Sequence, residues 1–334
     1  MTLRTIVLII ALAISMNMAG CNGLTAVASS PSSTATRVPP TETPTVAPPS
    51  ATPTITPTAT PQPTATPTWV VQGPDAVKVP ILLFHHIAVS PIGSRYYVPP
   101  DKFEAYLKLL HDWGYTTITT SALIQAITQG VSLPPRPLLI TFDDGNEDNY
   151  TNAFPIMQKY GFTGVLYIVV QFMNQPNYLT TSQIKEMAAA GWEVGSHSET
   201  HRDLITSTDT LRYEIVQSRQ DLEDRLGVPI LTFAYPFGDE NSAAGDYVHF
   251  AGYIAAMGAS GFTWDQGKGN LYVLQRCEIK ASDDVKSMTR FLPWLGDPSF
   301  LPTDTPTPTP TSSRTPIPTY TQYPTRTPAL PPTP

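Results

Sequence analysis

The chain has 334 residues, a formal net charge of −7 and only two cysteines. This acidic balance, with few clusters of Lys and Arg, argues against nucleic acid as a partner. More than half of the 36 prolines lie in two segments rich in Thr-Pro steps, residues 31–67 and 302–334. Such segments contain too few apolar side chains to form a core, so one globular domain is expected between them.

The N-terminus has the pattern of an export signal. Arg4 precedes the apolar run IVLIIALAISM, and Met-Ala-Gly-Cys21 follows soon afterwards. The run is too short to span a bilayer comfortably and suits the hydrophobic region of a signal peptide. The residues before Cys21 resemble the bacterial lipobox, in which the cysteine receives a lipid. We therefore expect a lipoprotein signal at residues 1–21 and a lipid anchor on the outer face of the cytoplasmic membrane. The alternatives are an uncleaved anchor and an ordinary signal peptide with a coincidental cysteine.

Composition divides the rest of the chain into three parts. A disordered Pro/Thr-rich tether is expected at residues 22–75, a folded domain at 76–301 and a second disordered tail at 302–334. If Cys21 carries a lipid, Cys277 has no partner, so no disulfide is expected. A buried, unreactive thiol is the interpretation of Cys277 in the apolar stretch LYVLQRCEI. We expect the folded domain to be a monomer held at the cell surface.

Strand-like and helix-like stretches alternate along the folded part. Strands are expected at residues 79–87, 115–118, 137–142, 163–170, 192–196, 230–235, 253–257 and 271–274. Helices are expected at residues 99–114, 121–129, in the stretch that ends near Tyr160, and at 181–191, 210–226 and 243–251. Such alternation implies parallel strands with right-handed crossovers, and about seven units fit an irregular (β/α) barrel better than an open sheet. No Gly-rich phosphate loop follows any of these strands, so nucleotide chemistry is unsupported.

Reactive residues follow two of these strands, where a barrel of this kind gathers its functional groups. The strand PLLITF ends in Asp143 and Asp144, and WEVGS is followed by His197-Ser-Glu-Thr-His201. Two histidines four residues apart reach one point if the segment turns helically. One carboxylate and two imidazoles would form a metal site with open positions. The cation would offset the repulsion between the adjacent aspartates, and the second carboxylate would face water as a base.

The motifs TFDDG, HSETH and FAYPFG, in this order and spacing, resemble the polysaccharide deacetylases of carbohydrate esterase family 4, the NodB-like domain. The similarity covers essentially residues 79–289. The early strand PILLFHHI is most similar to the branch that deacetylates surface exopolysaccharide such as poly-N-acetylglucosamine. The resemblance implies a divalent cofactor, expected to be zinc, with cobalt or nickel also accepted.

Carried over to this chain, the resemblance makes Asp144, His197 and His201 the metal ligands. It makes Asp143 the general base that takes a proton from the attacking water. The backbone N–H of Tyr235 becomes the second donor to the oxyanion.

The same resemblance places Pro236 and Phe237 in the wall of the sugar-binding site. These two residues follow the strand ILTFAY.

Two departures from the family pattern matter. Many members carry arginine where this chain has Ala234, and many supply a late histidine as general acid, which is missing here. We expect Arg276 to orient Asp143 in place of the missing arginine, with a solvated surface arginine as the alternative. His85 or His86 is the candidate for the general acid, although either could be a core histidine. A protonated Asp143 or a metal-bound group could also return the proton.

The leading hypothesis is therefore a metal-dependent hydrolase that removes N-acetyl groups from amino-sugar polymers at the cell surface. Poly-N-acetylglucosamine, peptidoglycan and chitin-like glycans are the candidate polymers. An O-deacetylase of acetylated xylan-like glycans would use the same site. A catalytically weak glycan-binding surface lipoprotein is the third alternative, kept open by the missing arginine and late histidine.

Overall fold

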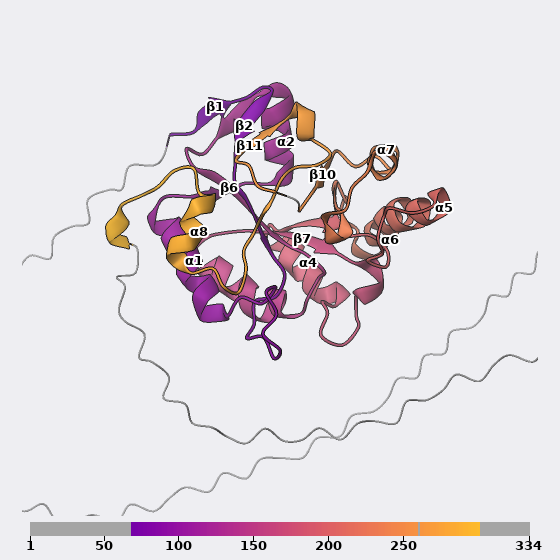
Figure 1. Ribbon diagram of the computed structural model, residues 1–334, viewed down its shortest axis with the longest axis horizontal. Coiled ribbons are helices and arrows are strands. Elements are labelled where there is room, and N and C mark those ends of the chain that lie inside the picture. The colour runs from indigo at the N-terminus through magenta and orange to yellow at the C-terminus, as the bar shows by residue number, and fades with distance from the viewer. Residues whose placement is uncertain (1–67, 260, 301–334) are drawn as a thin grey trace, which may run out of the picture. The chain divides into compact units, whose positions relative to one another are not determined.

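The computed structural model describes residues 68–259 and 261–300 (Figure 1). The expected signal peptide, Cys21, most of the expected tether and the tail at residues 302–334 lie outside the described residues. Among the residues described, no helix is both long enough and apolar enough to cross a membrane.

A curled parallel sheet forms the centre of the fold. Its strands are β3 (Ile81–Phe84), β4 (Thr116–Thr117), β6 (Pro137–Phe142), β7 (Val165–Ile168), β8 (Glu193–Ser196), β9 (Thr232–Ala234), β10 (Ala255–Met257) and β12 (Cys277–Glu278). They lie in the order β10-β9-β8-β7-β6-β3-β12, and β4 pairs with β6 outside this path. Every pair in this sheet is parallel, as the alternation of strands and helices predicted.

The two edges of the sheet approach one common segment of the chain. Leu274 forms a parallel bridge with Met257 of β10, and β12 pairs with β3 shortly afterwards. Residues 274–278 therefore contact both edges of the curled sheet. Only a few backbone hydrogen bonds connect the two edges there. This arrangement confirms the expected irregular (β/α) barrel, with seven strands in its main path.

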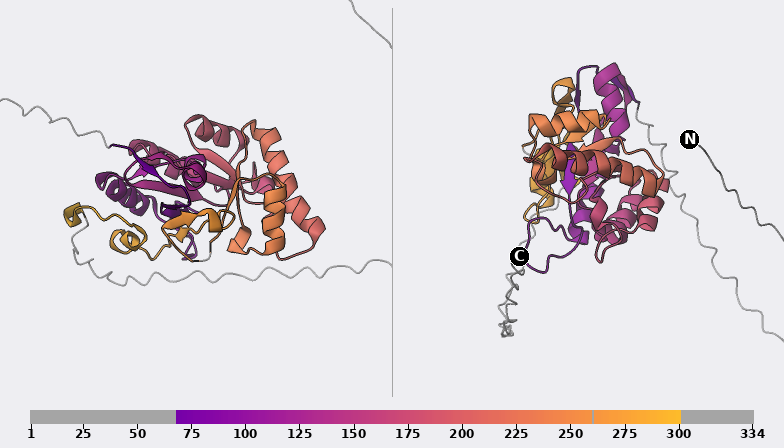
Figure 2. Two further views of the ribbon diagram at one scale, coloured as in Figure 1. Left: turned by 90° about the horizontal axis from the view of Figure 1, so that it is seen from above. Right: turned by 90° about the vertical axis from the view of Figure 1, so that its right-hand side faces the viewer.

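Helices lie around the outside of the sheet (Figures 1 and 2). They are α1 (Pro100–Asp112), α2 (Thr120–Gln129), α3 (Phe154–Lys159), α4 (Thr181–Ala189), α5 (Thr208–Leu211), α6 (Ser218–Leu226), α7 (Ser242–Phe250) and α8 (Val285–Met288). A π-helical stretch, Arg212–Gln217, connects α5 to α6, so the helix expected at residues 210–226 is continuous but changes its pitch.

The helix ends follow from local sequence signals. Thr180 and Gln183 form a capping box at the start of α4. Thr119 accepts a hydrogen bond from the backbone N–H of Ala122 and so caps α2, which ends at Gly130 with φ of 77°.

Side chains of the strands alternate between two apolar layers. Ile81 and Leu83 of β3 point into the curl, where Leu139 also lies, whereas Leu82 and Phe84 pack under the outer helices. For β3, β6 and β8 the next residue that faces the interior is therefore the one directly after the strand. This alternation directs His85, Asp143 and His197 toward the centre of the fold.

Two features differ from the sequence-based expectation. Antiparallel pairs join β1 (Val70–Gln72) to β5 (Val131–Leu133), and β2 (Ala76–Lys78) to β11 (Asp265–Gly267). Because β1 lies within residues 22–75, the folded part begins before residue 76.

The strand expected at residues 271–274 is not formed. A short 3-10 helix, Lys268–Asn270, precedes it, and Leu274 makes a single bridge. The apolar side chains of this segment pack into the core, so their composition reflects burial and not strand pairing.

We predict that Gly195→Ala destabilises the fold. A Cβ at Gly195 would lie 2.4 Å from Cε1 of the buried Tyr167 ring and 2.9 Å from the carbonyl oxygen of Thr232. Overpacking of this kind costs roughly 1–3 kcal/mol, measurable as the free energy of unfolding in denaturant. Gly269→Ala is the matched control, because its Cβ would meet nothing within 4 Å. Equal stability of the two variants would contradict the close packing inside the barrel.

Candidate metal centre and active site

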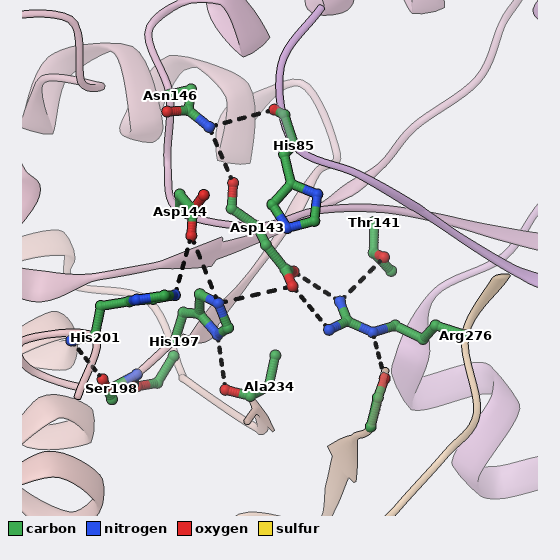
Figure 3. A network of polar contacts seen from close by, with 12 residues as sticks. His85, Thr141, Asp143, Asp144, Asn146, His197, Ser198, His201, Ala234 and Arg276 are labelled. Carbon is green, nitrogen blue, oxygen red and sulfur yellow. Dashed lines mark hydrogen bonds and ion pairs between the residues drawn. The ribbon is translucent and has the colours of Figure 1, made fainter. Parts of the chain in front are cut away.

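The candidate site lies at the carboxyl ends of the parallel strands (Figure 3). Asp143 and Asp144 follow β6, His197 follows β8 and His85 follows β3. A cavity of about 250 Å³ is lined by His85, His86, Asp143, Asp144, His197, His201, Tyr235 and Phe237, among others. Residues from four separate strand ends thus meet in one cavity, as the barrel architecture predicts.

Asp144, His197 and His201 converge on one point. Oδ1 of Asp144 lies 3.6 Å from Nε2 of His197 and 3.4 Å from Nε2 of His201. The ligand atoms of all three side chains lie within 4.8 Å of one another. Ligands at about 2.0–2.2 Å from a tetrahedral zinc ion are separated by roughly 3.3–3.6 Å. The spacing therefore fits a small divalent cation with three protein ligands.

The protonation of His197 also suits a cation. Its Nδ1 lies 2.8 Å from the carbonyl oxygen of Ala234 and must donate to it, which leaves the lone pair of Nε2 facing Asp144. Burial, opposed by the Asp143 carboxylate, lowers the pKa of His197 to about 4. The imidazole is then neutral at pH 7, and a bound cation would relieve the contact between its lone pair and the carboxylate oxygen.

The two histidines converge through a loop and not through the helical turn that the spacing suggested. The backbone of Ser198 has φ of 69° and that of His201 has φ of 60°. The hydroxyl of Ser198 accepts a hydrogen bond from the backbone N–H of His201 at 2.9 Å. This short turn, which follows β8 directly, brings the ring of His201 to 4.9 Å from the ring of His197.

Left-handed backbone conformations gather in this site. Asp144 has φ of 73° and Phe237 has φ of 60°, in addition to Ser198 and His201. Such conformations are costly for residues other than glycine and persist where the surrounding structure enforces them. Their clustering around one cavity marks it as the functional centre of the fold.

Arg276 is buried and bound to Asp143, which rules out a solvated surface arginine. Its Nη1 and Nη2 donate to the two carboxylate oxygens of Asp143 at 2.7 and 2.8 Å, and its Nε donates to the carbonyl of Gly258 at 2.8 Å. Only 1% of Arg276 is exposed. Burial, the largest single influence, would raise the pKa of Asp143, but the charge and hydrogen bonds of Arg276 together with the neighbouring His197 and His85 outweigh it, and the pKa falls to about 2.

Both candidate acids line the cavity, in different surroundings. Burial lowers the pKa of His85, despite the neighbouring carboxylate of Asp143, so its imidazole is mainly neutral at pH 7. His86 instead has Nδ1 at 2.7 Å from Oδ2 of Asp148. Of the two, His85 lies nearer the reacting groups.

The expected role of Tyr235 requires correction. Its backbone N–H donates to the carbonyl of Met257 at 3.1 Å, as part of the pairing between neighbouring strands, and is not free for an oxyanion. Pro236 is buried, whereas Phe237 is 65% exposed, with its ring 4.7 Å from that of His201. Of this pair, Phe237 lines the cavity.

The sequence interpretation missed part of the cavity wall. Arg95, Tyr96 and Tyr97 come from the loop between β3 and α1, and Glu278 comes from β12. The alternation of side chains along a strand places Glu278 on the same side as Arg276 and could have identified it. The loop carries no periodic pattern that points to the cavity.

Comparisons with known proteins support the family resemblance that the sequence motifs indicated. The family model for polysaccharide deacetylase matches residues 130–256. The Bacillus subtilis (strain 168) protein YxkH, whose name places it among polysaccharide deacetylases, is 30% identical over 215 residues, which cover 64% of this chain and 75% of that protein. A poly-beta-1,6-N-acetyl-D-glucosamine N-deacetylase of Staphylococcus aureus (strain N315) is 26% identical over 160 residues, 43% of this chain and 55% of the relative. The chain therefore matches about half the length of this second relative.

Two solved structures are similar over most of the domain. A Bacillus anthracis protein described as a polysaccharide deacetylase has a TM-score of 0.60 and 29% identity, covering 65% of this chain and 69% of that one. The Streptococcus pyogenes deacetylase PplD, solved in complex with acetate, has a TM-score of 0.61 and 25% identity, covering 68% of this chain and 99% of that one.

We predict that Arg276→Met lowers the free energy of unfolding by about 3–5 kcal/mol, because it leaves the Asp143 carboxylate buried without a partner. Combining it with Asp143→Asn should recover part of the loss, since the buried charge is then gone. Both effects are measured by chemical denaturation.

Lys159→Met serves as the control, because Lys159 and its partner Glu104 are exposed to 61% and 37%. Removal of such a surface pair should cost less than about 1 kcal/mol. A similar cost for Arg276→Met and Lys159→Met would refute the importance of the buried pair.

Proposed function

The chain belongs to the polysaccharide deacetylases, hydrolases that act on amide bonds, and on this premise we propose that it is a metal-dependent N-deacetylase of amino-sugar polymers. The observation that carries the proposal is the convergence of Asp144, His197 and His201 beside the buried carboxylate of Asp143. Poly-N-acetylglucosamine is the favoured polymer, supported by the name of the Staphylococcus aureus relative. Peptidoglycan and chitin-like glycans are further candidates.

Asp144, His197 and His201 would hold the cation. His197 is buried, whereas Asp144 and His201 are exposed to 23% and 21%, so the open side of the site faces the cavity. A bound divalent cation, zinc or alternatively cobalt or nickel, would supply a Lewis acid that acidifies a water molecule and polarises the acetyl carbonyl.

Asp143 would take the proton from the attacking water. Arg276 occupies one acceptor position on each carboxylate oxygen, which leaves further lone pairs free for the water. The ion pair keeps Asp143 ionised and fixed in orientation. A carboxylate with a pKa of about 2 is a weak base, so the acidification of the water must provide most of the driving force.

The oxyanion donor is reassigned to the backbone N–H of Phe237. Phe237 is the second residue of the short 3-10 helix Pro236–Gly238, so its backbone N–H has no acceptor within that helix and can donate to a ligand.

His85 would pass a proton to the sugar nitrogen as the carbon–nitrogen bond breaks. Because its imidazole is mainly neutral at pH 7, it would first take up the proton that Asp143 removes from the water. The products are acetate and a free amine on the sugar.

For the residues outside the described part of the chain, the proposal rests on amino-acid composition alone. A lipid on Cys21 would anchor the protein to the outer face of the cytoplasmic membrane, and residues 22–67 would act as a tether. The domain would then reach its glycan polymer at the cell surface as a monomer.

Acetate release tests this function. The zinc-loaded protein is incubated with β-1,4- and β-1,6-linked N-acetylglucosamine oligomers and with acetylated xylan, each with and without chelator. Acetate is quantified, and the glycans are weighed by mass spectrometry. Chelator-sensitive release from the amino-sugar oligomers is expected. Release from xylan alone would indicate an O-deacetylase, and binding without any release would indicate a glycan-binding protein.

We predict that Asp143→Asn lowers kcat by about 10²–10⁴-fold, the usual contribution of a general base, while zinc is still bound. Activity on N-acetylglucosamine oligomers and zinc content are measured on the same samples. Asp265→Asn, at a carboxylate that is 64% exposed, should leave kcat unchanged. Full activity of Asp143→Asn would remove Asp143 from the mechanism.

We also predict that His201→Ala weakens zinc binding by more than about 100-fold. Outer partners of a metal ligand already contribute 10–100-fold, and His201 is proposed as a direct ligand. Competition with a chromogenic chelator gives the affinity. His111→Ala is the control, because His111 is 58% exposed and lies in α1. Unaltered affinity in His201→Ala would exclude this residue as a ligand.

A further inference from the structure

Glu278 lines the catalytic cavity but takes no part in the proposed reaction. It is the last residue of β12 and lies two residues after Arg276. Successive side chains alternate along a strand, so Glu278 faces the same side as the arginine that holds Asp143. Its side chain is 18% exposed.

One carboxylate oxygen of Glu278 has no hydrogen-bond donor. Oε1 is shielded from solvent and finds no partner among the described residues. The nearest cations lie beyond hydrogen-bond distance, with Nε of Arg95 at 3.5 Å from Oε1 and Nζ of Lys280 at 3.8 Å from Oε2. An acceptor that is buried without a donor is costly. The Glu278 side chain lines the cavity and is partly exposed to it, so its carboxylate retains acceptor capacity that a ligand could use.

Arg95 and Tyr96 connect Glu278 to the reacting groups. The guanidinium of Arg95 lies 4.7 Å from the ring centre of Tyr96, and its Nη2 donates to the Tyr96 hydroxyl at 3.0 Å. The ring of Tyr96 is 4.6 Å from that of His85. The backbone N–H of Ala281 donates to the carbonyl of Arg95 at 2.8 Å, which fixes this loop against the chain after β12. Glu278 therefore belongs to the wall beside His85.

The chemistry of this wall selects the kind of ligand. A carboxylate can only accept hydrogen bonds, so the ligand must donate one. Arg95 and Lys280 already compensate the negative charge of Glu278, which favours a neutral donor over a cation. A cavity of about 250 Å³ is below the usual range for drug-sized ligands and suits a single sugar unit. An uncharged sugar ring presents several hydroxyl donors.

We propose that Glu278 accepts a hydrogen bond from a ring hydroxyl of the sugar unit that occupies the catalytic cavity, with Arg95 and Tyr96 holding that wall in place. Glu278 is then a specificity-determining residue, which makes the enzyme recognise a sugar ring and not only an acetyl group. This inference rests on the proposed function, because it takes the occupant of the cavity to be a sugar.

The kinetic test compares two substrates of zinc-loaded protein. One is an N-acetylglucosamine tetramer, and the other is 4-methylumbelliferyl acetate, which has an acetyl group but no sugar hydroxyl. Glu278→Ala should raise KM for the tetramer about tenfold or more, as expected for a hydrogen bond to a charged group. The kcat/KM for the ester should not change. Glu186→Ala, at an exposed position in α4, is the matched control.

A binding test separates recognition from catalysis. Affinity for the tetramer is measured by titration calorimetry on the full chain with chelator present, where no metal-dependent hydrolysis competes. Glu278→Gln, which keeps the side-chain volume, is measured with Glu278→Ala, and thermal unfolding verifies that both are folded. About tenfold weaker binding is expected for Glu278→Ala, and a smaller loss for Glu278→Gln, whose amide oxygen still accepts a hydrogen bond but carries no charge. Equal affinity of variants and wild type, or no tetramer binding by the wild type, overturns the inference. Tetramer binding that depends on Glu278, without any acetate release by the loaded wild type, would refute the deacetylase function but leave the hydroxyl contact in place.

Discussion

The buried ion pair between Asp143 and Arg276 is the contact on which the site and the closure of the sheet both depend. Asp143 follows β6 in the middle of the sheet, whereas Arg276 lies in the segment that approaches both edges. The third donor of Arg276 binds the carbonyl of Gly258, just after β10. Two charges that are removed from water need each other and a complete set of hydrogen bonds. The same guanidinium therefore links the two edges of the sheet and fixes the carboxylate proposed as the base.

This pair also explains how two adjacent aspartates can occupy one strand end. Asp143 is compensated by Arg276, whereas Asp144 turns toward two imidazoles. The left-handed backbone of Asp144 directs its side chain away from the path of a regular strand. Each carboxylate thus has its own partner: Arg276 offsets the charge of Asp143, and the cation proposed for the neighbouring site would offset that of Asp144.

Much of this arrangement is readable from the sequence. The alternation of apolar strands with amphipathic helices predicts the parallel barrel. The reactive residues directly after the strands predict where the cavity lies. Both predictions are possible because strands and helices are visible as local periodicity in the sequence. Features set by contacts distant in sequence are not predictable in this way. The strand at Val70–Gln72 follows a proline-rich segment and exists only through its pairing with Val131–Leu133. The left-handed turn at His201, the engaged N–H of Tyr235 and the loop that carries Tyr96 likewise have no periodic signature.

The order in which the site is assembled along the chain has a consequence for its biogenesis. The three proposed metal ligands lie between residues 144 and 201, and the family match ends at residue 256, but Arg276 and Glu278 come later still. Synthesis proceeds from the N-terminus and a domain generally folds as a unit, so these two residues are the last part of the site to emerge. A nascent chain that stops short of residue 276 holds the proposed ligands yet lacks the counter-charge of the base. A fragment that ends with the family match at residue 256 would therefore contain the proposed metal ligands but lack the guanidinium that compensates the buried charge of Asp143.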